Sequence, residues 1–99
     1  MSNVQITRDT AGRYKVAGSL VFTTVRDALK QSAAAFASES EWAIDLSQVS
    51  GADSAGLALL IEWHRLATKN NRPLRFIDAP TQLRALAKIS DLDDILPFA

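Results

Sequence analysis

Near the N-terminus, apolar residues alternate with polar ones. Val4 and Ile6 alternate with polar neighbours, and Tyr14 and Val16 do the same after the turn-forming segment Asp9–Gly12. This period of two indicates half-buried strands, because successive side chains of a strand point to opposite faces. The turn between the two runs predicts an antiparallel hairpin.

Helical spacing begins after Thr23 and Thr24, either of which can cap a helix. The apolar residues expected to face inward along this helix are Val25, Ala28, Leu29, Ala33 and Phe36. A strongly apolar strand then carries Trp42, Ile44 and Leu46.

A second helix is expected from Ser54 to about Asn70, where Pro73 prevents its continuation. A fourth strand follows over residues 74–77, and residues 78–80 open a third helix. Its inward residues are expected to be Leu83, Leu86 and Ala87, and residues 91–96 form a short last turn.

Strand, helix and strand from Trp42 to Ile77 constitute a βαβ unit, which is expected to be parallel and right-handed. We therefore predict one α/β domain over residues 1–99. It contains a four-stranded mixed sheet, built from the N-terminal hairpin and the βαβ unit and covered by three to four helices.

The central helix has an apolar arc wider than a helix lying on a sheet requires. The stripe expected to meet water is Ala58, Glu62, Arg65 and Lys69, and the face expected on the sheet is Leu57, Leu60, Trp63, His64 and Ala67. Leu59 and Leu66 flank the stripe. They form either a second packing layer against a neighbouring helix or an exposed docking surface around Leu59.

Composition restricts the classes of partner. Eleven basic and eleven acidic residues balance, so no overall field attracts nucleic acid. The absence of cysteine excludes disulfides and thiolate metal sites. Neither a secretory signal nor a run long enough for direct membrane insertion is visible, so a cytoplasmic location is expected.

The residues offer little for catalysis. The chain has one histidine, which lies on the apolar helix face, and it lacks the glycine-rich phosphate-binding motifs. The acidic residues Asp91, Asp93 and Asp94 lack the spacing of a calcium loop. We expect no enzymatic activity, no cofactor and no metal.

Residues 53–57 are the strongest candidate site. The apolar strand ends in a polar loop that brings Asp53 and Ser54 to the start of the central helix. Capping needs only one of the two, and a glycine in the first turn costs about 0.8–1 kcal/mol relative to alanine. Gly56 therefore indicates a close approach, and Ala55 and Ala58 keep the surround low. Capping, anion binding, phosphorylation and partner docking all stay open on these residues alone.

These residues resemble the signature of STAS domains, named for sulfate transporters and anti-sigma factor antagonists. The resemblance rests on residues 44–47, Val49 and residues 53–57, and the order of elements agrees with it over nearly the whole chain. In the antagonist subfamily, the serine matching Ser54 is phosphorylated by a partner kinase, which switches binding off.

The Mla-type subfamily is the closer resemblance. It is carried by residues 54–63 with the Glu62-Trp63 pair, by residues 86–97, and by residues 18–22, which are similar to its second strand. Many antagonists carry an acidic residue where Val21 stands. The resemblance implies a subunit that binds the ATPase of an ABC transporter, within a complex with its membrane permease. Such a complex moves phospholipid and maintains outer-membrane lipid asymmetry.

In that subfamily the hydroxyl residue matching Ser54 lies at the contact with the ATPase. The resemblance therefore implies a partner surface made of Asp53, Ser54, Ala55, Gly56, Ala58 and Leu59. Phosphorylation of Ser54 is the alternative.

Overall fold

Four strands and three helices follow one another in the described part of the chain, residues 3–9, 12–36 and 39–99 of the computed structural model. They are β1 (Gln5–Arg8), β2 (Tyr14–Leu20), α1 (Val25–Phe36), β3 (Trp42–Ala52), α2 (Ser54–Lys69), β4 (Leu74–Ile77) and α3 (Thr81–Ile89).

The strands form one mixed sheet in the order β1-β2-β3-β4. β1 and β2 pair antiparallel, whereas β3 runs parallel to both β2 and β4. The predicted α/β class, the hairpin and the βαβ unit are confirmed. The hairpin closes where Asp9 N donates to Arg13 O at 2.8 Å. Thr10 and Ala11, which belong to the expected turn, lie outside the described residues.

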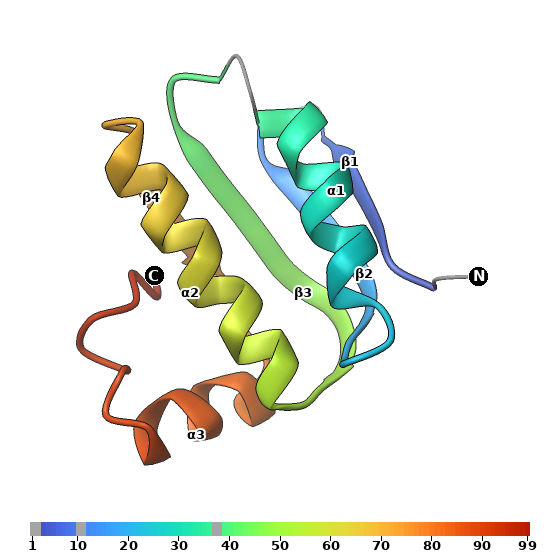
Figure 1. Cartoon of the computed structure of the whole chain (residues 1–99), viewed down its shortest axis with the longest axis vertical. Coiled ribbons are helices and arrows are strands. Elements are labelled where there is room, and N and C mark those ends of the chain that lie inside the picture. The colour runs from blue at the N-terminus through green and yellow to red at the C-terminus, as the bar shows by residue number, and fades with distance from the viewer. Residues whose placement is uncertain (1–2, 10–11, 37–38) are drawn as a thin grey trace.

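The main core lies between the sheet and the helices α1 and α2, which run side by side across one of its faces (Figure 1). Aromatic rings fill the part of the core near the end of α1 and the start of β3. There the ring centroid of Phe36 lies 4.5 Å from that of Tyr14, 5.1 Å from that of Trp42 and 5.8 Å from that of Trp63. Trp63 is fully buried, as its place on the apolar face of the helix predicted.

β3 is longer than predicted, because residues 47–52 continue the strand and do not form a polar loop. Register shifts against β2 after Lys15 and after Gly18 place extra residues on β3, and such bulges let polar side chains turn outward while pairing resumes. At the first shift, Asp45 Oδ1 accepts a hydrogen bond from Ser47 N at 2.8 Å. Only Asp53 therefore separates β3 from α2.

Asp45 is a buried carboxylate in the middle of this strand. Burial acts to raise its pKa, but hydrogen bonds from Ser47 and the charges of Lys15 and Arg13 outweigh that effect, so the pKa lies below its ordinary value. The ionised form of Asp45 therefore stabilises the fold at neutral pH.

Two further expectations near α1 were wrong. Ala33 is exposed and Ser32 is buried in its place, because the Ser32 hydroxyl accepts a bond from Trp63 Nε1 at 2.8 Å and donates to Leu29 O at 2.7 Å. β2 ends at Leu20, so Val21 and Phe22 lie in the turn before α1. That turn is held by Thr24, whose hydroxyl accepts from Val21 N at 3.0 Å and donates to Ser19 O at 2.7 Å.

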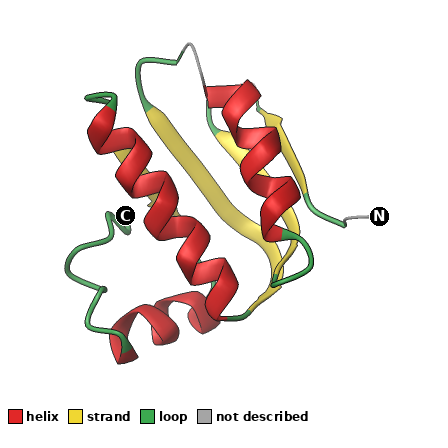
Figure 2. Ribbon diagram, viewed as in Figure 1, coloured by secondary structure: helices red, strands yellow, loops and turns green. Residues whose placement is uncertain are grey.

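α3 lies across the N-terminal end of α2, and the C-terminal loop after it returns to β4 (Figure 2). Leu83 and Ala87 of α3 are buried as predicted. Phe76 N donates to Pro97 O at 2.9 Å and Ala99 N donates to Phe76 O at 2.8 Å. These bonds occupy the outer edge of β4, which would otherwise expose unpaired backbone groups.

Candidate functional site

Asp53 is the N-cap of α2. Its Oδ1 accepts hydrogen bonds from Ala55 N at 2.8 Å and from Gly56 N at 3.3 Å. Its Oδ2 accepts from Phe22 N at 3.2 Å, and Asp53 N donates to Leu20 O at 3.2 Å. One side chain thus satisfies the first turn of α2 and ties it to the turn that follows β2.

Gly56 is buried and its lack of a side chain is required by the chain itself. A Cβ built at this position would overlap the carbonyl oxygen of Leu20 and lie 3.1 Å from Leu20 Cβ and 3.3 Å from Ala52 Cβ. The close approach that the sequence predicted is therefore present, but the group that approaches is the backbone of β2 and not an external partner. Gly56 cannot itself contact a partner from this position.

Ser54 is the first residue of α2 and is exposed. Asp53 caps the start of the helix, so the Ser54 hydroxyl is not needed there, and it makes no hydrogen bond within the part of the chain that the structure describes. A small hydroxyl thus stands at the positive end of a sixteen-residue helix with its bonding capacity unused.

An open groove of about 670 Å³ runs between α1 and α2, and Ala55, the residue that follows Ser54, is the first residue of α2 in its lining. Ala55, Ala58, Leu59 and Glu62 line it from α2. The opposite wall comes from the turn after β2 and from α1, and consists of Phe22, Thr23, Val25, Arg26 and Leu29. The groove is mostly apolar with charged residues at its edges.

Phe22 stands at one edge of this groove with 81% of its surface exposed. Its likeness to a strand residue in the sequence did not predict a place in the site. The sequence holds no distinguishing signal for Phe22, because single exposed apolar side chains are normal on protein surfaces.

Leu59 decides between the two alternatives that the wide apolar arc left open. It is 4% exposed and belongs to the main core, so it is part of a packing layer and does not offer the exposed docking surface predicted among the site residues. Leu66 also packs against that core. The wide apolar arc of the helix is therefore explained largely by packing against α1, and Leu59 contributes only the floor of the groove. Among the six site residues predicted, Ser54 and Ala58 are exposed, Asp53 and Ala55 are half-buried, and Gly56 and Leu59 are buried.

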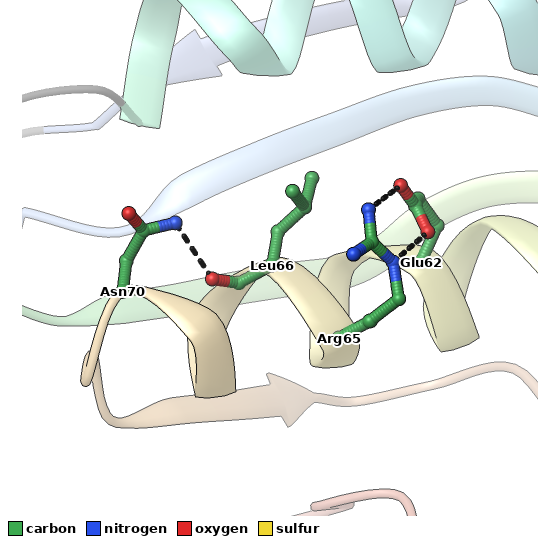
Figure 3. Close-up of polar contacts among 4 residues, drawn as sticks. All are labelled: Glu62, Arg65, Leu66 and Asn70. Atoms are coloured by element: carbon green, nitrogen blue, oxygen red, sulfur yellow. Dashed lines mark hydrogen bonds and ion pairs between the residues drawn. The ribbon is translucent and has the colours of Figure 1, made fainter.

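Glu62 and Arg65 form a two-pronged ion pair along the exposed side of α2 (Figure 3). Both bonds, from Arg65 Nε and from Arg65 Nη2, are 2.7 Å long. The hydrogen bond from Arg65 lowers the pKa of Glu62 below its usual value. The pair leaves Glu62 ionised beside the groove at neutral pH.

The arrangement does not support a hydrolytic pair. His64 follows Ser54 by ten positions on the same helix, which separates them by about 15 Å along its axis. Among the described residues, no group of three or more histidine, cysteine or acidic side chains is placed to hold a metal ion. None of the helices in these residues has the length and apolar character needed to cross a membrane.

Comparisons with known proteins agree with this geometry. A family model described as "Mlab, STAS domain" matches residues 4–97. The solved structure of the anti-sigma factor antagonist SpoIIAA in its unphosphorylated form has a TM-score of 0.71 at 19% identity, covering 97% of this chain and 87% of that one. No curated protein matches the sequence significantly.

A second solved structure, the murine anion transporter Slc26a9 in its inward-facing state, has a TM-score of 0.59 at 16% identity. The match covers 84% of this chain but 14% of the transporter. At these identities, both structures establish the shared fold.

Proposed function

This chain belongs to the MlaB-like STAS domain family, and on that premise we propose that it is a non-catalytic subunit of an ABC-type phospholipid transport system. In this proposal it binds the ATPase subunit on the cytoplasmic side of the inner membrane. Binding supports assembly and activity of the complex, which also contains the permease, and so maintains outer-membrane lipid asymmetry.

The observation that carries the proposal is the exposed Ser54 hydroxyl with no structural task of its own. Partner contacts of this kind are made by groups whose bonding capacity the monomer leaves unused, next to apolar area that the partner can cover. The groove beside Ser54 supplies that area, with Phe22 as an aromatic anchor at its edge. When the ATPase binds this surface, its conformational equilibrium shifts toward the conformation that fits the surface.

The test is a pull-down from membranes of the native host, with a tagged chain as bait and the captured proteins identified by mass spectrometry. The proposal predicts recovery of an ABC ATPase together with its permease. The matched bait is Ser54→Arg, which places a long charged side chain on the proposed contact. Equal recovery with both baits, or recovery of no ATPase, contradicts the proposal.

The alternative function is that of an anti-sigma factor antagonist controlled by phosphorylation of Ser54. Its support is the accessibility of the same hydroxyl and the similarity of fold to SpoIIAA. A phosphate would add about −1.5 to −2 charges, which a helix N-terminus stabilises but neighbouring Asp53 repels. Intact-mass measurement of protein purified from the native host distinguishes the two. A kinase-dependent form heavier by one phosphate, lost in Ser54→Ala, favours the antagonist.

A further inference from the structure

A second concave site lies at the other end of α1 and α2, far from Ser54. It is a cavity of about 310 Å³ lined by Ser32, Ala33 and Phe36 of α1, Trp42 of β3, and Leu66, Asn70 and Arg72 from the end of α2. Its volume is at the lower end of the range for small-molecule pockets. Figure 3 shows Leu66 and Asn70 on the side of α2 that faces α1.

The two tryptophans of the core differ in one respect that bears on this cavity. The indole N–H of Trp63 is satisfied by Ser32 at 2.8 Å. The indole Nε1 of Trp42 is buried and has no hydrogen-bond partner among the described residues, although the whole residue is only 6% exposed. An unpaired buried donor is uncommon in a native protein, and it favours a site where an acceptor from outside the chain completes the bond.

Arg72, which lines the cavity, also favours an acceptor from outside the chain. Arg72 is exposed, and its guanidinium has no ion-pair partner in the part of the chain that the structure describes. The left-handed residue Asn71, with φ of 55°, turns the chain so that Arg72 N donates back to Ala67 O at 2.8 Å. That bond fixes the backbone from which the Arg72 side chain reaches the cavity.

The carbonyl groups at the end of α2 do not compete for Arg72 or Trp42. Asn70 Nδ2 and Asn70 N donate to Leu66 O at 2.8 Å and 3.0 Å, and Asn71 N donates to Thr68 O at 3.2 Å. The helix end is thus closed by its own chain (Figure 3). The lining of the cavity therefore includes the positively charged guanidinium of Arg72 and the unpaired indole N–H of Trp42, together with the apolar side chains of Phe36 and Leu66.

We propose that this cavity binds a small amphipathic anion, with an apolar body on Phe36 and Leu66 and a carboxylate or phosphate head group between Arg72 and Trp42. The N–H of Trp42 is covered by protein atoms, so the proposed contact requires the side chains around it to move. This inference is independent of the proposed docking role of Ser54, which lies at the opposite end of α2.

The test is a ¹H–¹⁵N NMR titration of the whole chain with sodium octanoate and with octyl phosphate, each below its micelle concentration. The two indole N–H signals can be assigned with Trp42→Phe and Trp63→Phe. The proposal predicts a saturable downfield shift of the Trp42 signal that exceeds the shift of the Trp63 signal. Stronger binding by one probe identifies the head group as carboxylate or phosphate, and either result supports the site.

Three control probes restrict the chemistry. Octylammonium has the same body with the opposite charge, octanol lacks a charge, and inorganic phosphate lacks the body. Each should shift the Trp42 signal much less than the anionic probes at equal concentration. An equal shift with octylammonium or octanol overturns the anionic assignment, and an equal shift with inorganic phosphate overturns the amphipathic one. The absence of a saturable shift with either anionic probe overturns the proposal.

The variant Arg72→Ala should raise the apparent dissociation constant about three- to tenfold, as expected for the loss of one charge-assisted contact. Lys69→Ala is the matched control, because it removes the same charge from an exposed position outside the cavity lining. It should change the constant by less than about twofold. Equal weakening by both variants would mean that general charge attraction, and not this cavity, holds the anion.

Discussion

At both ends of α2, a short polar side chain satisfies the free backbone groups, but the two ends leave different groups without a hydrogen-bond partner. At the N-terminal end, Asp53 satisfies the first turn and fastens it to β2, so the remaining group is a hydroxyl on the surface. At the C-terminal end, Asn70 and Asn71 satisfy the last turn, so the remaining groups are a buried indole N–H and an arginine beside a cavity. A surface hydroxyl fits contact with a macromolecule, whereas a covered donor in a cavity fits a small molecule.

The comparison is most severely tested at Gly56. Replacement by alanine should destabilise the fold by about 3 kcal/mol, because the added methyl overlaps the Leu20 carbonyl and backbone cannot move aside cheaply. Gly51→Ala is the matched control, since a Cβ there meets only Gln82 Oε1 at 4.0 Å. Denaturant unfolding of both variants measures the difference. If Gly56→Ala is as stable as Gly51→Ala, the close packing of α2 on β2 is wrong.

The tryptophan pair tests the other end. Trp63→Phe should cost about 0.5–1.5 kcal/mol more than Trp42→Phe, because it removes the buried hydrogen bond to Ser32, whose hydroxyl keeps only its bond to Leu29 O. Trp42→Phe removes an N–H that has no partner among the described residues. The same unfolding measurement compares the two variants. Equal losses would show that the Trp42 N–H is satisfied in solution.

Asp53 separates capping from docking. Asp53→Ala should lose about 1–2 kcal/mol of unfolding free energy, because it removes the bonds to Ala55, Gly56 and Phe22. Ser54→Ala should change stability by less than about 0.5 kcal/mol. A larger loss from Ser54→Ala would assign the capping to Ser54 and remove the argument that its hydroxyl is unused.

Asp45 gives the smallest effect and a pH dependence. Its folded-state pKa is depressed, so its contribution is present above the unfolded pKa of about 3.9 and is lost as pH falls through the folded value. Asp45→Asn should therefore be less stable by about 1 kcal/mol at pH 7, with the difference disappearing in acid. Unfolding measured from pH 7 to pH 2 tests this, and a difference that persists at pH 2 would contradict it.

The sequence predicted the elements well because their signals are local. Alternation in the first strands, helical spacing in α2 and the βαβ order all depend on near neighbours along the chain. The errors occurred where a distant segment decides the outcome. Residues 47–52 have the composition of a loop, yet pairing with β2 makes them a bulged continuation of β3.

The candidate site shows the same limit. Local patterns singled out Asp53, Ser54 and Gly56 but could not assign their separate tasks. Gly56 serves the packing of Leu20, which lies thirty-six positions earlier, and Leu59 turns inward because α1 packs beside it. Phe22 and the cavity near Trp42 depend on how three segments meet, so no local pattern indicated them.

The central claim is that Ser54 serves a partner and not the fold. It is tested most directly by measuring two quantities on Ser54→Arg, the unfolding free energy and the affinity for the purified ATPase. Thr68→Arg, at an exposed position near the other end of the same helix, is the control for added charge. The account predicts that both variants fold with nearly unchanged stability and that only Ser54→Arg loses affinity, by about tenfold or more. Equal affinity of the two variants for the ATPase would contradict it.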